Sequence, residues 1–522
     1  MLRLRLTIGI VIAALASIAS GYRILGIYPY PSLSHQLVFR SVSLELVKRG
    51  HEVVVFTTYP MKDVAIANYT EIDLSILVQK WKSQTDFVSL GTNMIKFAHS
   101  VIEFGVEVSD TILSHPEMQK ILAPNSTEKF DLIIMQHLCY DALYALSERL
   151  NIPMMGISSM NILYMQHFHY GNDLSTPYGI NFLNGAKVDN FWQRLLEVGY
   201  LVKGVHVHFT KTLKIQDKVM RKHFGDTVSP IDKLADRFEI MLVGIHPFLV
   251  EIRPSVPNFV YIGGCRFLDG SKPKALPENL KTTLDNAKEG LIYFSMGSNV
   301  KVGNLPEAMR NAILSTFAEL PYTVIWKSEI NLEGLPANVI MKKWCPQQAI
   351  LMHPNVVLFI FQGGLQSTEE AIEGEVPMLG MPIFADQYAN VQLLKERGVA
   401  EDLQMSEFSK KAFKRAILKV ISNPSYKENI RKLRDLLHDI PYHPMENAIW
   451  WIEHVVRHKG AKHLRCKSRD TEMYKLLHLD VIAFLLALLI ILLVALYSVL
   501  RCIYRKIMRL TRQCVEKSLK ID

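Results

Sequence analysis

Glycines and polar side chains gather in one stretch of the sequence, residues 344–387, in an order that suits the binding of a phosphorylated ligand. The apolar run at residues 356–361 predicts a buried strand, Gly363 and Gly364 predict a turn, and residues 365–373 predict a helix. Glycines at such a turn let a diphosphate approach the backbone, and the N–H groups and dipole of the helix favour its negative charge. We therefore expect a ligand site here, although the same arrangement also occurs where an α/β unit simply packs tightly.

Side chains with hydrogen-bonding groups follow the glycines and extend the expected site. A second strand, predicted at residues 378–383, is followed by Asp386 and Gln387. Open α/β sheets bind their ligands at the carboxyl ends of their strands, so these two side chains are expected near the glycines. Three more lie on the first turns of the predicted helix, where the carboxylate of the last could accept hydrogen bonds from ribose: Gln366, Ser367 and Glu370.

Residues 344–387 resemble the signature of the UDP-glycosyltransferase family, GT-B enzymes that transfer a sugar from a UDP-sugar to a small lipophilic acceptor. The resemblance is to the membrane-bound animal branch, and residues 365–368 are most similar to insect members. It implies an α/β fold of two Rossmann-like domains facing a cleft, with UDP-sugar as co-substrate and no metal or other cofactor. The sequence has no G-x-G-x-x-G run after a predicted strand, which argues against a dehydrogenase, and no D-x-D motif for a metal.

The resemblance also implies roles for individual donor-site residues. Gly297 and Ser298, after a strand predicted at residues 291–295, match a loop that approaches the donor phosphates. Gln362 departs from the family, which commonly has His before the double glycine; an amide can still donate to a phosphate oxygen but carries no charge. The remaining roles fall within the signature: Trp344 for stacking on uracil, Gln347 beside the nucleoside, Gln366 and Ser367 near the phosphates, Glu370 on the ribose, and Asp386 with Gln387 on the sugar hydroxyls.

Inverting sugar transfer needs a base that takes a proton from the acceptor. His35, in the loop before a helix predicted at residues 36–49, resembles the family's catalytic histidine by its place in the run from Pro29. The family's partner to this histidine is an aspartate after a later strand, and Gln136 occupies that position here. Glutamine can accept the ring N–H and fix a tautomer of imidazole, but it cannot offset the charge of imidazolium. Asp141 would reach His35 only if the loop shifted.

A weakened base predicts a restricted choice of acceptor, because phenols and carboxylic acids ionise far more readily than aliphatic alcohols. We therefore predict an inverting hexosyltransferase that conjugates a small lipophilic acceptor such as a phenol, as in detoxification. We expect the sugar to be glucose, because Asp386 and Gln387 suit neutral hydroxyls and no cation for glucuronate is evident. Gln136 and Gln362 keep a second hypothesis open, a catalytically silent protein that binds UDP-sugar or a lipophile, or regulates active relatives.

The pattern of apolar runs divides the chain of 522 residues into several parts. Strands predicted at residues 23–28, 52–57, 130–135 and 154–157 belong to an acceptor-binding domain, residues 22–255, which helical sequence interrupts at residues 71–124. A linker rich in Pro, Gly and Lys, residues 256–285, precedes the UDP-sugar-binding domain, residues 286–445. Residues 446–478 are expected to hold the helix that crosses back onto the first domain in GT-B proteins, and a juxtamembrane segment.

Both termini carry targeting signals. Residues 1–21 have two arginines, an apolar run and then small residues, as in a cleavable signal peptide, with a retained anchor as the alternative. Residues 481–500 lack charge and are long enough to span a bilayer as a helix, whereas a soluble core helix would not be followed by the basic segment 501–522. Basic residues stay cytosolic, so we predict a single-pass protein of the endoplasmic reticulum with a lumenal body. Much of the formal charge of +9 lies in this tail, and nothing suggests nucleic-acid binding.

Three smaller features complete the sequence. Asn68 and Asn125 begin glycosylation sequons, which fits a lumenal body. The six cysteines show no spacing that fixes a disulfide, and a homo-oligomer stays open. Within the aromatic segment 161–209, which we expect to contribute acceptor-binding surface, the pairs His167/His169 and His206/His208 could each lie on one face of a strand; aromatic packing is a commoner role for them than metal binding.

Overall fold

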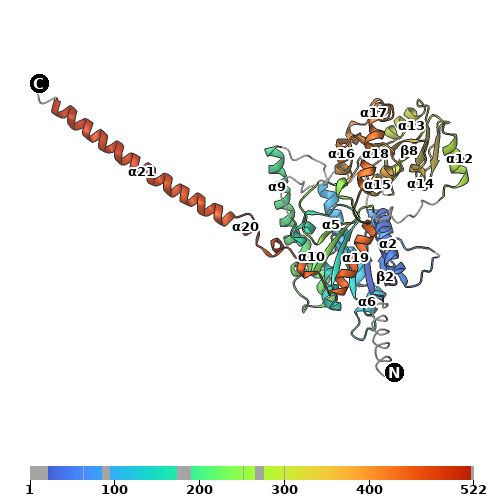
Figure 1. The fold of residues 1–522 in the computed structure, drawn as a ribbon, viewed down its shortest axis with the longest axis horizontal. Coiled ribbons are helices and arrows are strands. Elements are labelled where there is room, and N and C mark those ends of the chain that lie inside the picture. Colours follow the sequence, from blue (N-terminus) through green and yellow to red (C-terminus); the bar gives the residue numbers. More distant parts are fainter. Residues whose placement is uncertain are drawn as a thin grey trace, which may run out of the picture. The chain divides into compact units, whose positions relative to one another are not determined.

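The computed structural model describes residues 21–62, 64–84, 94–172, 190–250, 252–264, 275–298 and 300–518. The chain separates into two compact units, Met1–Arg465 and Cys466–Asp522, which are described in turn. The predicted signal peptide lies outside the described residues, apart from Gly21. The first unit contains two sheets with helices around each (Figure 1).

The first sheet has seven parallel strands in the order β3-β2-β1-β4-β5-β6-β7. Its central strands are apolar and buried on both faces, as expected where helices cover a parallel sheet on both sides. The strands are β1 (Arg23–Tyr28), β2 (Glu52–Thr57), β3 (Tyr69–Asp73), β4 (Leu132–Gln136), β5 (Met154–Ser158), β6 (Phe238–Val243) and β7 (Phe259–Tyr261).

The helices that accompany this sheet fill its connections. In the part of residues 71–124 that the structure describes, the segment predicted as helical contains three of them but also the end of β3. The helices are α2 (Leu33–Lys48), α3 (Ile76–Gln84), α5 (Met94–Leu113), α6 (Pro116–Leu122), η1 (Asp141–Tyr144), α7 (Ala145–Leu150), α8 (Tyr164–Tyr170), α9 (Phe191–Val207), the π-helical η3 (His208–Thr212), α10 (Leu213–Phe224), α11 (Ile231–Leu234), η4 (Ala235–Arg237) and η5 (Pro247–Leu249).

The second sheet has six parallel strands in the order β10-β9-β8-β11-β12-β13, so it repeats the strand order of the first. Its strands are β8 (Leu291–Ser295), β9 (Thr323–Lys327), β10 (Val339–Lys342), β11 (Val356–Phe361), β12 (Met378–Gly380) and β13 (Ala400–Asp402). Its helices are α12 (Glu278–Asn286), η6 (Val302–Asn304), α13 (Glu307–Phe317), α14 (Gln347–Leu351), α15 (Leu365–Glu373), α16 (Gln387–Glu396), η7 (Met405–Glu407), α17 (Lys410–Ser422) and α18 (Ser425–His438).

Helix α19 (Pro444–Arg457) returns from the second sheet to the first, as predicted. Its apolar stripe of Met445, Ile449 and Ile452 is buried in the same core cluster as Ile24 of β1 and Phe39 of α2. Ion pairs between Arg49 and Glu446 and between His51 and Glu453 lie at the edge of this contact. The C-terminal end of the second half of the unit therefore completes the core of the first.

The second unit consists mainly of one long helix, α21 (Leu479–Ser518), preceded by the short α20 (Met473–Leu476). The helix has an 18-residue window of mean hydropathy 3.2 that is not buried against the described protein, and it is long enough to cross a membrane. It includes the predicted span, residues 481–500, and continues through most of the basic tail.

Element boundaries differ from the prediction in three places that matter. Helix α2 begins at Leu33, not at residue 36, because Ser32 is already in the extended N-cap conformation, so His35 lies in the first turn of the helix and not in a loop. The sequence of residues 139–150 predicts a single helix, which the structure divides into η1 and α7. Strand β7 belongs to the first sheet although it lies within the expected linker, residues 256–285, because its short apolar run pairs with β6.

Candidate active site

The two sheets have corresponding topological switch points, where neighbouring strands lead to connections on opposite sides. In the first sheet this point lies between β1 and β4, and in the second between β8 and β11. Ligands of doubly wound sheets bind beyond the carboxyl ends of the strands at such points. His35 and Gln136 follow or end the strands at the first switch point, and Gly297 and Gln362 follow the strands at the second.

At the second switch point, the predicted nucleoside residues form one hydrogen-bonded cluster. Gln347 Nε2 donates to Ser367 Oγ at 2.8 Å and to Glu370 Oε2 at 2.7 Å. Gln347 Oε1 accepts from the hydroxyl of Tyr293 on β8 at 3.3 Å. The carboxylate of Glu370 is thereby held in a fixed orientation, and a carboxylate can accept from several donors at once, so hydroxyl groups can join this cluster.

The glycine turn before α15 has the backbone that the sequence predicts. Gly363 has φ +95°, and a Cβ atom there would lie 2.5 Å from Val391 Cγ2. Gly364 is the N-cap of α15, and no side chain caps the helix. Asn390 Nδ2 fixes the turn by donating to Gly363 O at 3.0 Å. The first N–H groups of α15 are thus presented without a competing carboxylate in the first turn, which is the arrangement that binds anions.

Strand β9 ends in a cation that contacts the loop after β8. Lys327, the last residue of β9, donates from Nζ to Gly297 O at 2.6 Å. The same ammonium lies 5.7 Å from the centroid of the Trp344 ring, and this residue is 63% exposed. Ser298 is exposed in the same loop. Burial lowers the pKa of Lys327, but it remains a candidate positive charge for the donor site.

Gln362 occupies a confined position between the two glycine loops. A Cβ atom on Gly297 would lie 2.3 Å from Gln362 Nε2, and one on Gly364 would lie 3.1 Å from it, so a side chain at either position would require the Gln362 amide to move. Gln362 Oε1 is buried and has no hydrogen-bond partner among the described residues. An amide in this place can present either end to a ligand, because its nitrogen and oxygen can exchange places by rotation.

The predicted sugar-binding pair lies in a strained loop at the start of α16. Gln387 Oε1 accepts from the N–H groups of Ile383 at 3.0 Å and Phe384 at 3.1 Å. Ala385 has φ +55°, which is unusual for a residue with a side chain and is common at functional sites. Asp386 is half-buried, and desolvation raises the pKa of its carboxyl group, which accepts a hydrogen bond from Asn390 at 2.9 Å.

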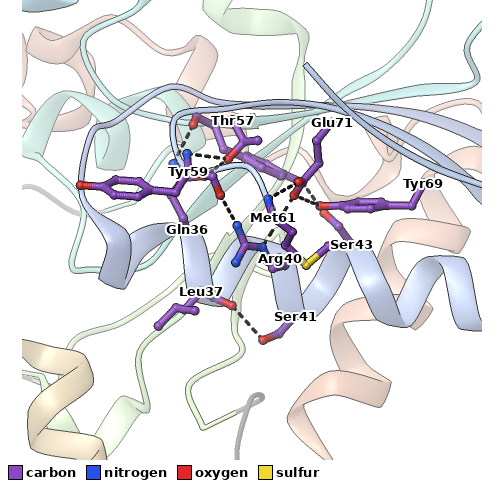
Figure 2. Close-up of polar contacts among 11 residues, drawn as sticks. Gln36, Leu37, Arg40, Ser41, Ser43, Thr57, Tyr59, Met61, Tyr69 and Glu71 are labelled. Atoms are coloured by element: carbon purple, nitrogen blue, oxygen red, sulfur yellow. Dashed lines mark hydrogen bonds and ion pairs between the residues drawn. The ribbon is translucent and has the colours of Figure 1, made fainter. Parts of the chain in front are cut away.

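At the first switch point, the turn that carries His35 is fixed by the next residue, Gln36. Its Nε2 donates to the carbonyl oxygens of Tyr28 at 2.7 Å and Tyr30 at 3.1 Å, and its Oε1 accepts from Thr57 Oγ1 at 2.8 Å. Figure 2 shows Gln36 and Thr57 meeting above the first turn of α2. The buried amide joins the ends of β1 and β2 to α2, so His35 is attached to a rigid support.

A second set of contacts in Figure 2 fixes the loop after β2. Arg40 of α2 donates to Tyr59 O, and its Nε lies 3.7 Å from Glu71 Oε1 of β3. The same carboxylate accepts from Met61 N at 2.6 Å and from the Tyr69 hydroxyl at 2.9 Å. The loop and α2 are therefore held together by one half-buried ion-pair network.

His35 and Gln136 lie together, as expected from the sequence, but the amide is turned in an unexpected way. Gln136 Oε1 accepts from the backbone N–H of Tyr30 at 3.0 Å. A backbone N–H can only donate, so the amide oxygen must face Tyr30 and the amide nitrogen must face His35. Gln136 Nε2 lies 3.3 Å from His35 Nδ1. Our expectation that glutamine would accept a hydrogen from the ring is therefore wrong, because Tyr30 holds the acceptor end.

This orientation determines the tautomer of His35. An amide nitrogen only donates, so His35 Nδ1 must accept and the proton of the neutral ring is on Nε2. Burial lowers the pKa of His35 to about 4, which keeps the ring neutral at physiological pH. An aspartate at position 136 would accept from Nδ1–H and leave the Nε2 lone pair free. With Gln136 at this position, the Nε2 atom of His35 carries the hydrogen and acts as a hydrogen-bond donor.

Asp141 does not replace the missing carboxylate. It is buried in η1, where desolvation raises its pKa to about 7 and its hydrogen bonds are to its own backbone and to Tyr144. Among the described residues, no hydrogen bond joins it to His35. Tyr30, by contrast, packs on His35 with ring centroids 4.9 Å apart, and the Asp386 carboxylate is near enough to contribute to the raised pKa of Tyr30.

Contacts between the two halves of the first unit lie beside these residues. Gln366 Nε2 donates to Ser159 O at 2.5 Å, and the Phe97 and Phe384 rings have centroids 5.7 Å apart. Gln366 thus makes an interdomain contact, whereas the sequence suggested only a role in binding the donor. Asp386 and His35 also come from different halves, and both lie near Tyr30.

Several residues of the site were not identified from the sequence. Tyr30, Lys327 and Asn390 each control a predicted residue through a hydrogen bond or a ring contact. Tyr30 follows β1 at the first switch point, and Lys327 ends β9, the strand beside β8. A position at the carboxyl end of a buried strand is a signal that could have found both residues. Nothing in the sequence indicates the partner of Asn390, because that contact depends on the path of the glycine turn.

The histidine pairs are not on strands, and that prediction is wrong. His167 and His169 lie on α8, and His206 and His208 lie at the junction of α9 and η3. Side chains two residues apart in a helix point to different sides of it, so neither pair shares a face. The ring nitrogens of His167 lie 3.3 Å and 3.0 Å from its neighbours Asn172 and Arg253. Helix formation in these segments overrode the strand propensity of their aromatic residues. The rest of the expected acceptor surface, residues 173–189, lies outside the described residues.

Two sheets of one strand order, a helix that returns to the first half and a glycine turn at the second switch point define a GT-B glycosyltransferase. The structure of the glycotransferase of kitacinnamycin has a TM-score of 0.57, at 18% identity over 83% of this chain and 98% of that one. An anthocyanidin 3-O-glucosyltransferase in complex with UDP also has a TM-score of 0.57, at 14% identity over 84% of this chain and 100% of that one.

The chain belongs to the UDP-glycosyltransferase family. The family model described as "UDP-glucoronosyl and UDP-glucosyl transferase" matches residues 27–514. UDP-glycosyltransferase UGT5 of Dactylopius coccus is 33% identical over 91% of this chain and 90% of its own length. Human UDP-glucuronosyltransferase 2B17 is 28% identical over 92% of this chain and 91% of its own length. The protein is therefore a UDP-glycosyltransferase that uses a UDP-sugar donor and an acceptor substrate.

Proposed function

We propose that the protein transfers glucose from UDP-glucose, with inversion, to a small lipophilic acceptor whose reacting group is acidic, a phenol or a carboxylic acid. The single observation that carries this choice of acceptor is the orientation of Gln136, which makes His35 Nε2 a hydrogen-bond donor. The sugar is proposed as glucose because the candidate sugar contacts, Asp386 and Gln387, are an acid and an amide that suit neutral hydroxyls. An ecdysteroid UDP-glucosyltransferase of Spodoptera littoralis nuclear polyhedrosis virus is 29% identical to the chain.

In the proposed reaction, the acceptor reaches the site with its oxygen already ionised. His35 Nε2–H donates a hydrogen bond that orients this oxygen toward the anomeric carbon. The acceptor oxygen forms a bond to that carbon while the bond from the carbon to the diphosphate oxygen breaks, so UDP leaves with the electron pair. The N–H groups of α15, Lys327 and the amide of Gln362 are the candidates for stabilising the leaving diphosphate. No protein group has to remove a proton.

The experiment compares a phenol and an alkanol of similar size with UDP-glucose, in the wild type and in Gln136→Asp. We expect the wild type to use the phenol and to leave the alkanol nearly untouched. The aspartate should accept from Nδ1–H, free the Nε2 lone pair and raise turnover of the alkanol at least about tenfold, a small part of the ~10⁴ that a carboxylate partner contributes to the histidine of a protease triad. Equal use of both acceptors by the wild type, or no response to the substitution, would contradict the proposal.

A control must separate acceptor chemistry from folding, because the substitution Gln136→Asp buries a carboxylate. Gln136→Glu provides a longer carboxylate, and Gln136→Asn keeps an amide that is too short to bridge Tyr30 and His35. We expect gain of alkanol turnover only in the carboxylate variants, with the melting temperature of all three checked by thermal unfolding. If the asparagine variant gains the same activity, the tautomer is not the cause.

The orientation of Gln136 also favours one alternative function, a protein that binds UDP-sugar without turning it over. A donor-type His35 would make such a protein inert toward alcohols. Isothermal titration with UDP together with a panel of phenols and carboxylic acids separates the two. Product from any acid acceptor supports the transferase, whereas UDP binding with no product from the whole panel supports the silent protein.

We further propose that the enzyme needs no metal and resides in the endoplasmic reticulum as a single-pass protein with a lumenal body, serving detoxification. The apolar helix α21 fits a membrane anchor, and both sequon residues, Asn68 and Asn125, are exposed. Activity should be unchanged by a chelator. Digestion of intact microsomes with protease should remove only the C-terminal tail, and endoglycosidase treatment should lower the apparent mass in two steps.

A further inference from the structure

Helix α9 exposes large apolar side chains in an unusual concentration. Trp192 is 71% exposed, and the neighbouring apolar residues of α9 and η3 are between 44% and 63% exposed. These residues are Phe191, Leu195, Leu196, Val198, Tyr200, Val202 and Phe209. Single exposed apolar residues are ordinary, but a continuous set on one helix marks an interaction surface.

The exposed residues include one continuous stripe of the helix. Phe191, Leu195, Val198 and Val202 follow one another at intervals of four, three and four residues, which places them on a single face. Another face packs on the protein: Glu197 is buried, and a Cβ atom on Gly204 would lie 2.4 Å from the Tyr164 hydroxyl. Figure 1 shows α9 as a rod that leads through η3 into α10.

The charges near this stripe are basic. On α9 the only acidic residue is the buried Glu197, whereas Arg194 and Lys203 are basic. The elements that follow, η3 and α10, add three exposed basic residues close to the exposed Phe209 and Ile215, namely Lys211, Lys214 and Lys218. An apolar stripe with aromatic anchors and flanking lysines is the pattern of a helix that lies in the interface of an anionic bilayer.

The chain itself brings a bilayer within reach. The segment between α19 and α21, residues 458–478, spans at most ~70 Å even when fully extended. The same chain thus continues from α19 through a short segment into the apolar helix α21, which is long enough to cross a membrane. We propose that α9 docks the enzyme body on the bilayer surface, with the stripe from Phe191 to Phe209 among the lipids and the lysines at anionic headgroups.

The test uses tryptophan fluorescence of the full-length enzyme in vesicles of phosphatidylcholine and phosphatidylserine with brominated acyl chains, which quench only at membrane depth. The sequence of α21 contains no tryptophan, so the anchor contributes no background. We expect Trp192→Phe to lose most of the lipid-dependent quenching. Trp450→Phe, at a position that is 49% exposed on α19, is the matched control and should retain it.

A second variant keeps the tryptophan and disturbs the docking. In Leu195→Glu/Leu196→Glu, Trp192 should lose its quenching while the melting temperature stays within a few degrees of the wild type, because both leucines are exposed. Quenching that is the same in the wild type and in Trp192→Phe would overturn the proposal. If a second copy of the chain covers the stripe instead, quenching would also be the same in the wild type and in Trp192→Phe. Cross-linking would then give a dimer that the double variant abolishes.

Discussion

The two halves of the enzyme body have the same strand order, yet the sites at their switch points are built differently. In the C-terminal half, Gln347, Ser367 and Glu370 form a connected cluster around a carboxylate, and Lys327 adds a cation. In the N-terminal half, the hydrogen-bond and ring partners of His35 among the described residues are the neutral amide of Gln136 and the ring of Tyr30. The difference suggests that the donor half fixes the sugar and the diphosphate, while the acceptor half relies on chemistry that the acceptor brings with it.

Loss of the carboxylate of the donor cluster should have the largest effect. Glu370→Ala removes the proposed acceptor for the ribose hydroxyls and leaves Gln347 Nε2 without one of its two acceptors. A hydrogen bond to a charged group is worth about 1.5–3 kcal/mol, so we expect kcat/KM for UDP-glucose to fall by about 10- to 100-fold or more. Glu307→Ala, exposed on α13, is the control and should behave as the wild type.

The glycine turn should be the next most sensitive element. Gly363→Ala places a Cβ atom 2.5 Å from Val391 Cγ2 in a backbone with φ +95°. We expect a loss of about 1–3 kcal/mol in the free energy of unfolding and weaker UDP binding, measured by chemical denaturation and calorimetry. Gly334→Ala, which also has positive φ but open space around it, should cost only the backbone strain and leave UDP binding intact.

The pH dependence of kcat/KM tests the role of His35 in the acceptor half. Since the pKa of His35 is held near 4, the ring is neutral across the physiological range and the wild type should show no inflection near the usual histidine pKa of about 6.5. With a phenol as acceptor, kcat/KM should instead rise about tenfold per pH unit until the pKa of the phenol itself, because only the ionised form reacts. Two phenols of different acidity would give profiles displaced by the difference in their own pKa values; coincident profiles would show that a protein group titrates.

Lys327→Met tests whether the cation compensates for the neutral Gln362. We expect about a tenfold higher KM for UDP-glucose, an effect that shrinks in high salt because screening weakens the charge. The matched variant Lys288→Met, also in the C-terminal half, should change nothing. A KM that is unchanged in low salt would remove Lys327 from the donor site.

The smallest effect is expected from restoring the family's histidine. Gln362→His would add a titratable donor beside Gly297 and Gly364, in place of an amide whose Oε1 is buried and without a partner among the described residues. We expect a gain of a few-fold in UDP affinity below about pH 6.5 that disappears above it, as the imidazole loses its charge. A gain that does not depend on pH would show that shape, and not charge, limits binding.

The sequence predicted the donor half better than the acceptor half for a physical reason. The strand, glycine turn and helix at residues 356–373 are local, so apolar runs and glycines determine them, and the structure has them at β11, Gly363 and α15. The adjacency of His35 and Gln136 also followed from the position of each after its strand. The orientation of the Gln136 amide could not be predicted from the sequence. It depends on the backbone N–H of Tyr30, a group that any residue type except proline could supply.

Features that depend on distant contacts were the hardest to predict. The apolar run of β7 was hidden in the expected linker, since its pairing with β6 depends on the rest of the sheet. The histidine pairs were placed on strands because their aromatic neighbours favour strands locally, whereas the structure has helices there. The role of Gln366 at the interface with Ser159 involves two residues far apart in the chain and has no local signal.

Helix α19 has a consequence for biosynthesis. It fills part of the core under β1 and α2, so the first domain to leave the ribosome keeps an apolar gap until residue 457 has been made. The proposed membrane anchor, α21, begins at Leu479, so its insertion would follow soon after closure of that gap. A nascent chain that is released early would present this uncovered surface to chaperones, which gives quality control a way to distinguish unfinished molecules from complete ones.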